Sequence, residues 1–245
     1  MTLFEFSGCA LIAFGPPMTM FFLTLADNPI FIIVMISSGF FWLLSLLVSS
    51  IIWTIVFPLK EILVFGVICS VIVQEIYRYL FYAILKKAQI GLQKVSDVGN
   101  RGHLYSISWS TLSYVSGFGF GIMSGAFSLV NVLADSTGPG TVGLYGDSPY
   151  FFISTSLITL ALILLHTFWG IIFFDALDKK CRYKIGYVVV SHLAVSALTF
   201  FNQQQLYLAS LIPCYLITVI TASIAYQCAG GTLKSLKESL PFVSG

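Results

Sequence analysis

Charged side chains are scarce in this chain: Asp, Glu, Lys and Arg make up 9% of its 245 residues, whereas 58% are hydrophobic. A soluble domain carries about 25% charged residues, so this composition excludes an ordinary water-soluble fold. The five cysteines lie apart with no paired spacing, which argues against a disulfide framework or a zinc knuckle. No Asn-x-Ser/Thr acceptor occurs, and we expect no N-linked glycan.

The motifs of several enzyme classes are missing as well. The sequence contains no His-Glu-x-x-His pair, no Gly-x-Ser-x-Gly elbow and no phosphate-binding loop. These patterns mark zinc peptidases, serine hydrolases and nucleotide-binding proteins respectively. We therefore expect no metal and no cofactor.

Long apolar runs are what the chain has in abundance. A transmembrane helix needs about 20 predominantly apolar residues to cross a hydrocarbon core about 30 Å thick. Seven runs reach or approach that length, and they cover residues 3–25, 30–56, 62–85, 109–133, 149–177, 185–201 and 207–228. The sixth run is short. The sequence predicts an all-α polytopic membrane protein with seven transmembrane helices in a single domain, residues 1–245.

The basic residues set the expected orientation, because Lys and Arg concentrate in cytosolic loops. With seven spans, eleven of the twelve lie on one side of the membrane, in or beside the third and fifth connections and in the C-terminal tail. Only Lys60 lies on the other side. We therefore expect a luminal or extracellular N-terminus and a cytosolic C-terminus.

Three glycines recur every four residues within the fourth run: Gly117, Gly121 and Gly125. Residues four apart share one face of a helix. Helices in lipid associate through close packing, and glycine lets two backbones approach each other. We expect this face to hold another helix. Packing within the chain and an interface for a partner are both open interpretations.

Four ionisable residues lie inside the apolar runs, namely Glu75, Arg78, His166 and His192. Each charge costs about 2.5–3.5 kcal/mol at the bilayer centre on insertion scales, so each residue requires a partner or a function. A rise of 1.5 Å per residue places all four about 12–16 Å inside the cytosolic span ends. Gly117 lies at a similar depth. The spacing predicts one polar layer supplied by several helices.

Structural and functional interpretations of this layer both remain open. Glu75 and Arg78 lie three residues apart on one helix face and can pair with each other. An acid and two histidines could instead activate water in an intramembrane hydrolase, or relay protons in a transporter. The transporter class is disfavoured because no inverted repeat is evident. A seven-span receptor would lack the expected Asp-Arg-Tyr and Asn-Pro-x-x-Tyr patterns.

Several stretches match the pattern of one known family. They are Phe-Ser-Gly-Cys at 6–9, Ile-Ala-Phe-Gly-Pro at 12–16, Phe-Phe-Trp-Leu-Leu-Ser-Leu-Leu at 40–47, Gln-Glu at 74–75 with Arg78, Tyr-Val-Ser-Gly at 114–117, Gly-Asp-Ser-Pro-Tyr at 146–150, Leu-His-Thr-Phe-Trp-Gly at 165–170, Phe-Asp-Ala at 174–176 and Ser-His-Leu at 191–193. With these motifs the chain resembles the anterior-pharynx-defective (Aph) subunits of the γ-secretase complex over nearly its whole length.

The resemblance implies a non-catalytic scaffold that assembles with nicastrin, presenilin and presenilin enhancer. Presenilin supplies the aspartyl protease, which cleaves type I membrane proteins such as Notch and the amyloid precursor protein. The family's glycine motif maps onto Gly117, Gly121 and Gly125 and serves assembly. Its intramembrane histidines map onto His166 and His192 and support assembly and activity. The resemblance also implies residence in the endoplasmic reticulum, the Golgi and the plasma or endosomal membranes.

The chain departs from the family pattern in two places, since the second connection at 57–61 and the tail after Gly230 are both short. Functions that the family assigns to those segments are not carried over.

The same family faintly resembles the membrane-embedded CAAX prenyl endopeptidases, which use a pair of Glu residues and an Arg on one helix with His on two others. Here Gln74 stands beside Glu75 where two acids are required, and Ser196 stands where an Asn is typical. An intramembrane hydrolase that uses Glu75, His166 and His192 is the alternative to the scaffold.

Overall fold

The computed structural model describes residues 3–59, 62–98, 108–136, 148, 150–232 and 235. Its elements are α1 (Leu3–Thr24), α2 (Pro29–Ile55), the 3-10 helix η1 (Phe57–Leu59), α3 (Leu63–Val98), α4 (Trp109–Ser136), α5 (Phe151–Asp178), α6 (Arg182–Leu198), the 3-10 helix η2 (Thr199–Gln204) and α7 (Tyr207–Cys228). Within these ranges, seven helical segments are long and apolar enough to cross a membrane. The predicted all-α polytopic class is confirmed.

The turn between α1 and α2 shows how local sequence starts a helix. The Asn28 side chain accepts a hydrogen bond from the Ile30 backbone N–H at 3.0 Å, and Pro29 occupies the first helical position. An Asn cap satisfies an amide that has no partner within the helix. Proline is favoured next to it because its missing N–H removes a second such amide.

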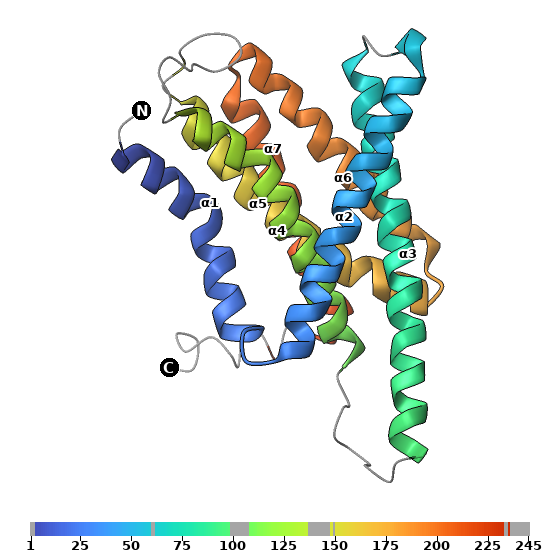
Figure 1. Cartoon of the computed structure of the whole chain (residues 1–245). Helices are drawn as coiled ribbons and strands as arrows, with labels where there is room; N and C mark the ends of the chain where they lie inside the picture. Colours follow the sequence, from blue (N-terminus) through green and yellow to red (C-terminus); the bar gives the residue numbers. More distant parts are fainter. Residues whose placement is uncertain are drawn as a thin grey trace.

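Two helices differ from the predicted apolar runs. α3 does not stop near residue 85 but continues to Val98, and its C-terminal part projects beyond the other helices (Figure 1). Lys86 and Lys87 end the apolar run, but Lys is a good helix former, so the helix outlasts the hydrophobic stretch. The short sixth run is completed by η2, and Arg182–Gln204 then spans 23 residues.

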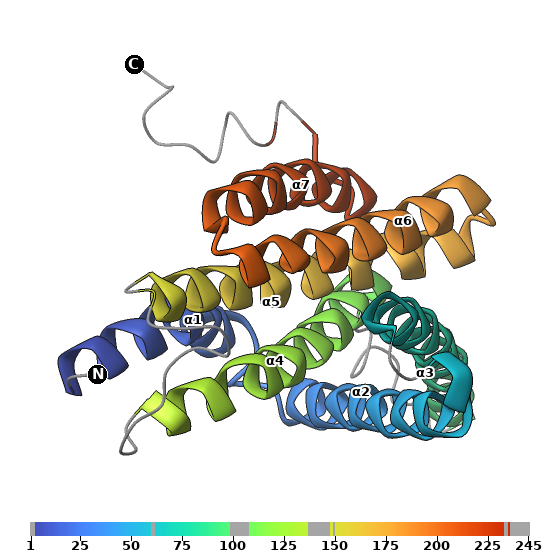
Figure 2. The same cartoon turned by 90° about the horizontal axis from the view of Figure 1, so that it is seen from above.

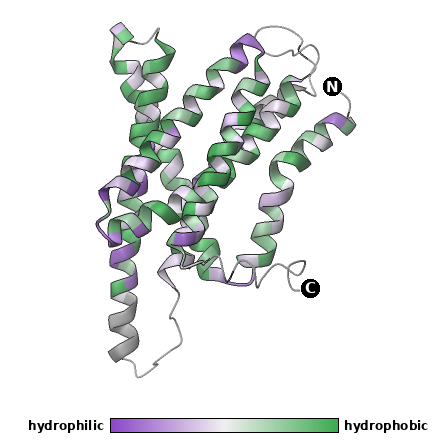
Figure 3. Cartoon of the chain, turned by 180° about the vertical axis from the view of Figure 1, so that it is seen from behind, coloured by the Kyte–Doolittle hydropathy of each residue, from purple (hydrophilic) through white to green (hydrophobic). Residues whose placement is uncertain are grey.

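Helices α4 and α5 form the centre of the bundle. Figures 1 and 2 both place α4 between α2 and α5. Their inner faces carry fully buried side chains such as Val115, Phe120, Leu165 and Ile172. Large hydrophobic side chains are exposed on the outer helices, among them Leu11, Ile33, Leu63 and Leu208. Figure 3 shows that hydrophobic residues dominate the helices and that hydrophilic ones gather near the α5–α6 turn. An apolar exterior of this kind suits a lipid environment.

Gly119 explains how closely α4 approaches α2. A Cβ atom at position 119 would collide with the Ser38 hydroxyl and with the backbone carbonyl of Met35. Gly119 is two residues from Gly117 and two from Gly121, so it faces the opposite side of α4. The spacing of the glycines predicts one packing face of this helix, whereas the structure uses both.

We predict that Gly119→Leu separates α2 from α4, because the new side chain meets backbone atoms that cannot move independently. Overpacking of this kind costs about 1–3 kcal/mol, so thermal unfolding in mild detergent should begin at a lower temperature. Gly15→Leu is the matched control, since no atom lies within 4 Å of a Cβ there. Equal unfolding temperatures for the two variants would contradict the packing role.

Candidate functional site

The four ionisable residues of the apolar runs meet at one place in the bundle. Glu75 and Arg78 come from α3, His166 from α5 and His192 from α6, and each is at most 5% exposed. We call these four residues the polar cluster. The predicted convergence of several helices on one layer is therefore seen directly in the contacts of these side chains.

Arg78 is the centre of the polar cluster. Its Nε atom donates to Glu75 Oε2 at 3.1 Å, and its Nη2 lies 3.3 Å from Glu75 Oε1. Across the bundle, Nη1 donates to the His166 backbone carbonyl at 3.2 Å and Nη2 contacts His166 Nδ1 at 2.9 Å. Arginine has no acceptor atom, so His166 Nδ1 must accept. This bond fixes His166 as the neutral tautomer protonated on Nε2.

Glu75 joins the third helix to the polar cluster. Its Oε1 atom lies 2.8 Å from His192 Nδ1. Glu75 is paired with the permanently charged Arg78 and therefore acts as the acceptor, so His192 carries its proton on Nδ1. The Nδ1 atoms of the two histidines thus play opposite roles, because that of His166 accepts from a cation and that of His192 donates to an anion.

Trp169 packs the two imidazole rings against each other. Its indole stacks on His192 with ring centroids 4.5 Å apart and meets His166 edge to face at 5.2 Å. The indole Nε1–H donates to Ser191 Oγ at 2.9 Å. Trp169 is not among the site residues predicted from the sequence, although its spacing of three from His166 places both on one helix face. Position alone did not reveal the contact with α6.

Phe120 of α4 closes another side of the cluster. The Arg78 guanidinium carbon lies 5.1 Å from the centroid of its ring. An arginine over an aromatic face gains a cation–π interaction that strengthens when water is excluded. The cluster therefore receives groups from α3, α4, α5 and α6.

The glycine face of α4 is occupied by α5 of the same chain. A Cβ atom at Gly117 would lie 2.6 Å from the Thr167 carbonyl oxygen, and one at Gly121 would lie 2.5 Å from that of Ile163. A Cβ at Gly125 would meet the Ile163 side chain at 2.6 Å. The sequence left two interpretations of this face open, packing within the chain and an interface for a partner. The structure places α5 of the same chain against it.

The glycine face and the polar cluster share an atom. The His166 carbonyl oxygen, which accepts a bond from Arg78, would lie 2.8 Å from a Cβ at Gly117. Any side chain at position 117 would push this carbonyl away from its place. The close approach of α4 to α5 therefore sets the position of a ligand of Arg78.

Ion pairs also join the helices at the membrane edge. Asp178 contacts Lys86 Nζ at 3.0 Å and Tyr82 Oη at 2.5 Å, which links α5 to α3. Asp175 pairs with Lys179 at 2.6 Å and with Lys184 of α6 at 2.8 Å. The hydrogen bond that Lys179 donates to the Asp175 carboxylate raises the pKa of Lys179. Because these pairs are exposed or partly exposed, water and salt screen the attraction between their charges.

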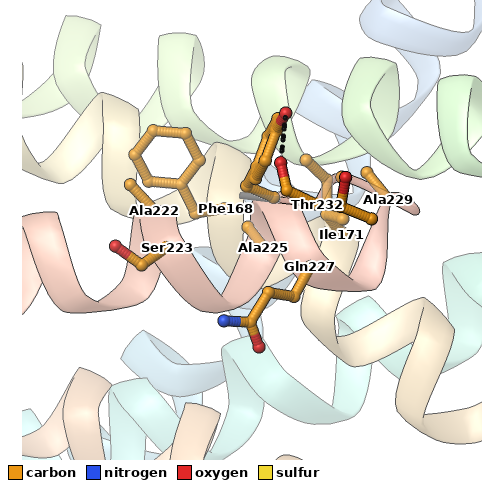
Figure 4. Close-up of a pocket in the computed structure, with 10 residues that line it drawn as sticks. Phe168, Ile171, Ala222, Ser223, Ala225, Gln227, Ala229 and Thr232 are labelled. Atoms are coloured by element: carbon orange, nitrogen blue, oxygen red, sulfur yellow. Dashed lines mark hydrogen bonds between the residues drawn. The ribbon is translucent and has the colours of Figure 1, made fainter. Parts of the chain in front are cut away.

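Among the described residues, the polar cluster is not part of a metal-ligand group, and it lies apart from the cavity beside α7. No group of three His, Cys, Asp or Glu side chains in that part of the chain could hold a metal ion. A cavity of about 700 Å³ lies between α5, α7 and the turn after α7, but residues such as Phe168, Ala222 and Ser223 line it, and no member of the polar cluster does (Figure 4).

Gln74 also serves packing. Its Oε1 accepts a hydrogen bond from the Trp42 indole of α2 at 3.2 Å, and its Nε2 donates to Ser70 Oγ at 3.0 Å. The amide thus links α3 to α2 at the position where an intramembrane hydrolase of the CAAX type would need a second acid.

We predict that a chain with Glu75 and Arg78 exchanged (Glu75→Arg with Arg78→Glu) is less stable than the wild type, although the pair is retained. The pair itself would survive, but each exchanged residue would face the wrong histidine. Removing one member of a buried ion pair costs about 3–5 kcal/mol. The exchange should therefore leave folded yield close to that of Arg78→Gln, measured by size-exclusion chromatography in mild detergent. Wild-type yield for the exchanged variant would show that the histidine contacts contribute little.

Comparison with known proteins agrees with this architecture. The family model described as "Aph-1 protein" matches residues 4–232. The chain is 49% identical to "Gamma-secretase subunit Aph-1" of Drosophila melanogaster, over 97% of this chain and 98% of the relative. It is 48% identical to "Gamma-secretase subunit Aph-1b" of Danio rerio and 45% identical to "Gamma-secretase subunit APH-1B" of Homo sapiens, each over 98% of this chain and 94% of the relative. The chain belongs to the Aph-1 family.

Proposed function

We propose that this chain is a non-catalytic scaffold subunit of a γ-secretase complex. The relatives that cover almost the whole chain carry the name of a γ-secretase subunit. The observation that supports the non-catalytic part is that the Glu75 carboxylate and the Arg78 guanidinium are both engaged within the polar cluster. The hydrogen bonds of Glu75 go to Arg78 and His192, and those of Arg78 go to Glu75 and His166.

A scaffold needs helices that stay in one arrangement before and after partners bind. In lipid the hydrophobic effect does not hold helices together, and close packing and hydrogen bonds do so instead. The polar cluster supplies directional bonds between α3, α5 and α6, and the glycine face supplies close packing between α4 and α5. Together they present the lipid-facing surfaces of the outer helices in fixed positions.

The partners that we propose are nicastrin, presenilin and presenilin enhancer, with presenilin providing the protease activity toward type I membrane proteins. The N-terminus would be luminal or extracellular and the C-terminus cytosolic. The complex would reside in the endoplasmic reticulum, the Golgi and the plasma or endosomal membranes. Seven apolar helices support the membrane setting, and the family resemblance supports the partners.

The role of Gly117, Gly121 and Gly125 in assembly follows from their place between α4 and α5. Because α5 fills this face, bulky substitutions would act on partner binding by displacing α5 and not by blocking a partner directly. The effect would extend to the polar cluster through the His166 carbonyl. This indirect route distinguishes the proposal from a glycine face that contacts a partner helix.

We predict that Gly117→Leu and Gly121→Leu each abolish recovery of nicastrin and presenilin with the tagged chain. The variants should still insert in the membrane, because the apolar runs are unchanged. The measurement is a mild-detergent pull-down followed by mass spectrometry and an inhibitor-sensitive protease assay. Gly15→Leu is the control and should recover the complex. Normal assembly by both bulky variants would contradict a role of the α4–α5 contact in assembly.

We also predict that His166→Ala combined with His192→Ala lowers the yield of the assembled complex, with activity per assembled complex changing less than the yield. The physical reason is the loss of the imidazole acceptor for Arg78 and of one of the two partners of Glu75. Yield and turnover are measured on the same purified material. A double variant that assembles fully yet has no turnover would return Glu75 and the two histidines to consideration as catalytic groups.

A further inference from the structure

A shallow apolar groove runs between α6 and α7, which lie side by side (Figure 2). Its volume is about 360 Å³, and its lining includes Tyr183, Gly186, Tyr187 and Val190 of α6 with Ile217 and Ile220 of α7. Val190 is 66% exposed and Ile220 is 54% exposed, so the groove faces outward. No atom lies within 4 Å of a Cβ at Gly186, which leaves the middle of the groove open.

Basic residues stand at the end of this groove where α6 begins. Lys179, Lys180 and Arg182 are exposed and lie within four residues of one another. Asp175 already binds Lys179 and Lys184. In the described part of the chain, no carboxylate forms an ion pair with Lys180 or Arg182. Among the described residues, this edge therefore carries positive charge that no carboxylate pairs with.

The helical register connects that charge to the groove. Arg182 precedes Gly186 by four residues and Val190 by eight, so the three lie along one stripe of α6. From Tyr183 to Val190 the groove follows α6 for about 10 Å at 1.5 Å per residue. Tyr183 is 74% exposed beside Arg182, and tyrosine is a residue favoured at membrane interfaces.

We propose that the α6–α7 groove binds one anionic phospholipid. The headgroup phosphate would lie on Arg182 and Lys180, and one acyl chain would lie along the groove past Gly186. Charge complementarity supports this occupant: clusters of Lys and Arg at the end of a membrane helix attract anionic headgroups, and an apolar groove below them accepts hydrocarbon. This inference does not depend on the proposed membership of a protease complex.

The test is native mass spectrometry of the purified chain with phosphatidylserine or phosphatidylcholine of identical acyl chains. We expect the anionic lipid to be retained at least tenfold more than the neutral one, with one molecule bound per chain. Lys180→Asn with Arg182→Gln should reduce retention of phosphatidylserine to the level of phosphatidylcholine. Asn suits position 180 because Lys180 has a φ of 55°, a conformation that Asn tolerates.

A groove variant separates the two parts of the proposed site. Gly186→Leu should lower phosphatidylserine retention without unfolding the chain, because a side chain at 186 meets open space. Matched controls are Lys87→Gln, a basic residue of α3, and Gly8→Leu, a glycine of α1 that is equally open. Both controls should retain the lipid, and size-exclusion chromatography confirms that every variant is folded.

Four results would overturn the proposal. Equal retention of the neutral and anionic lipids would show that the basic residues do not recognise the headgroup charge. Unchanged retention of phosphatidylserine by Gly186→Leu would show that the acyl chain does not lie in the groove. Full competition by the soluble headgroup glycerophosphoserine would indicate a phosphate site without an acyl chain. Occupation of the groove by a partner's transmembrane helix, seen as cross-links from Val190 to that helix with no lipid retained, would also contradict it.

Discussion

The charge of Arg78 is the constraint on which the rest of the bundle depends. A guanidinium keeps its proton in proteins, so a helix that carries it into lipid must also bring, or meet, enough acceptors. Glu75 supplies two on the same helix, and α5 supplies a ring nitrogen and a backbone carbonyl. Burial then makes these bonds stronger than they would be in water, and α3 is fixed against α5 by the need to satisfy one side chain.

The close packing of α4 against α5 is tied to the same buried charge. A peptide carbonyl within a helix already accepts its intrahelical bond, and the His166 carbonyl takes a second from Arg78 while Gly117 lies against it. Glycine on one helix and a polar acceptor on the next are therefore parts of one arrangement. Gly170 of α5 completes it, because a Cβ there would lie 2.6 Å from the Gly117 Cα. Hydrogen bonding and backbone contact, which the sequence displays as separate motifs, are physically joined.

Much of this could be predicted from the sequence because hydrophobic length, charge and helical period are local properties. The seven apolar helices, the common level at which Arg78 and His166 meet, and the shared face of the glycines all follow from counting residues. The end of α3 could not be predicted in this way, because Lys86 and Lys87 mark the end of the hydrocarbon and not of the helix. Gly119 and Trp169 were missed because their roles depend on which helices become neighbours, and spacing within one helix does not contain that information.

The bonds between α3 and α5 also differ in kind from the packing of α4 on α5. Apolar surfaces of similar shape can slide or rotate past each other with little change in energy, because dispersion forces have no preferred direction. A guanidinium that must reach a carboxylate, an imidazole nitrogen and a carbonyl at about 3 Å has one orientation that satisfies all three. The bonds of Arg78 therefore fix the tilt of α3, and of α2 packed against it, relative to the central helices.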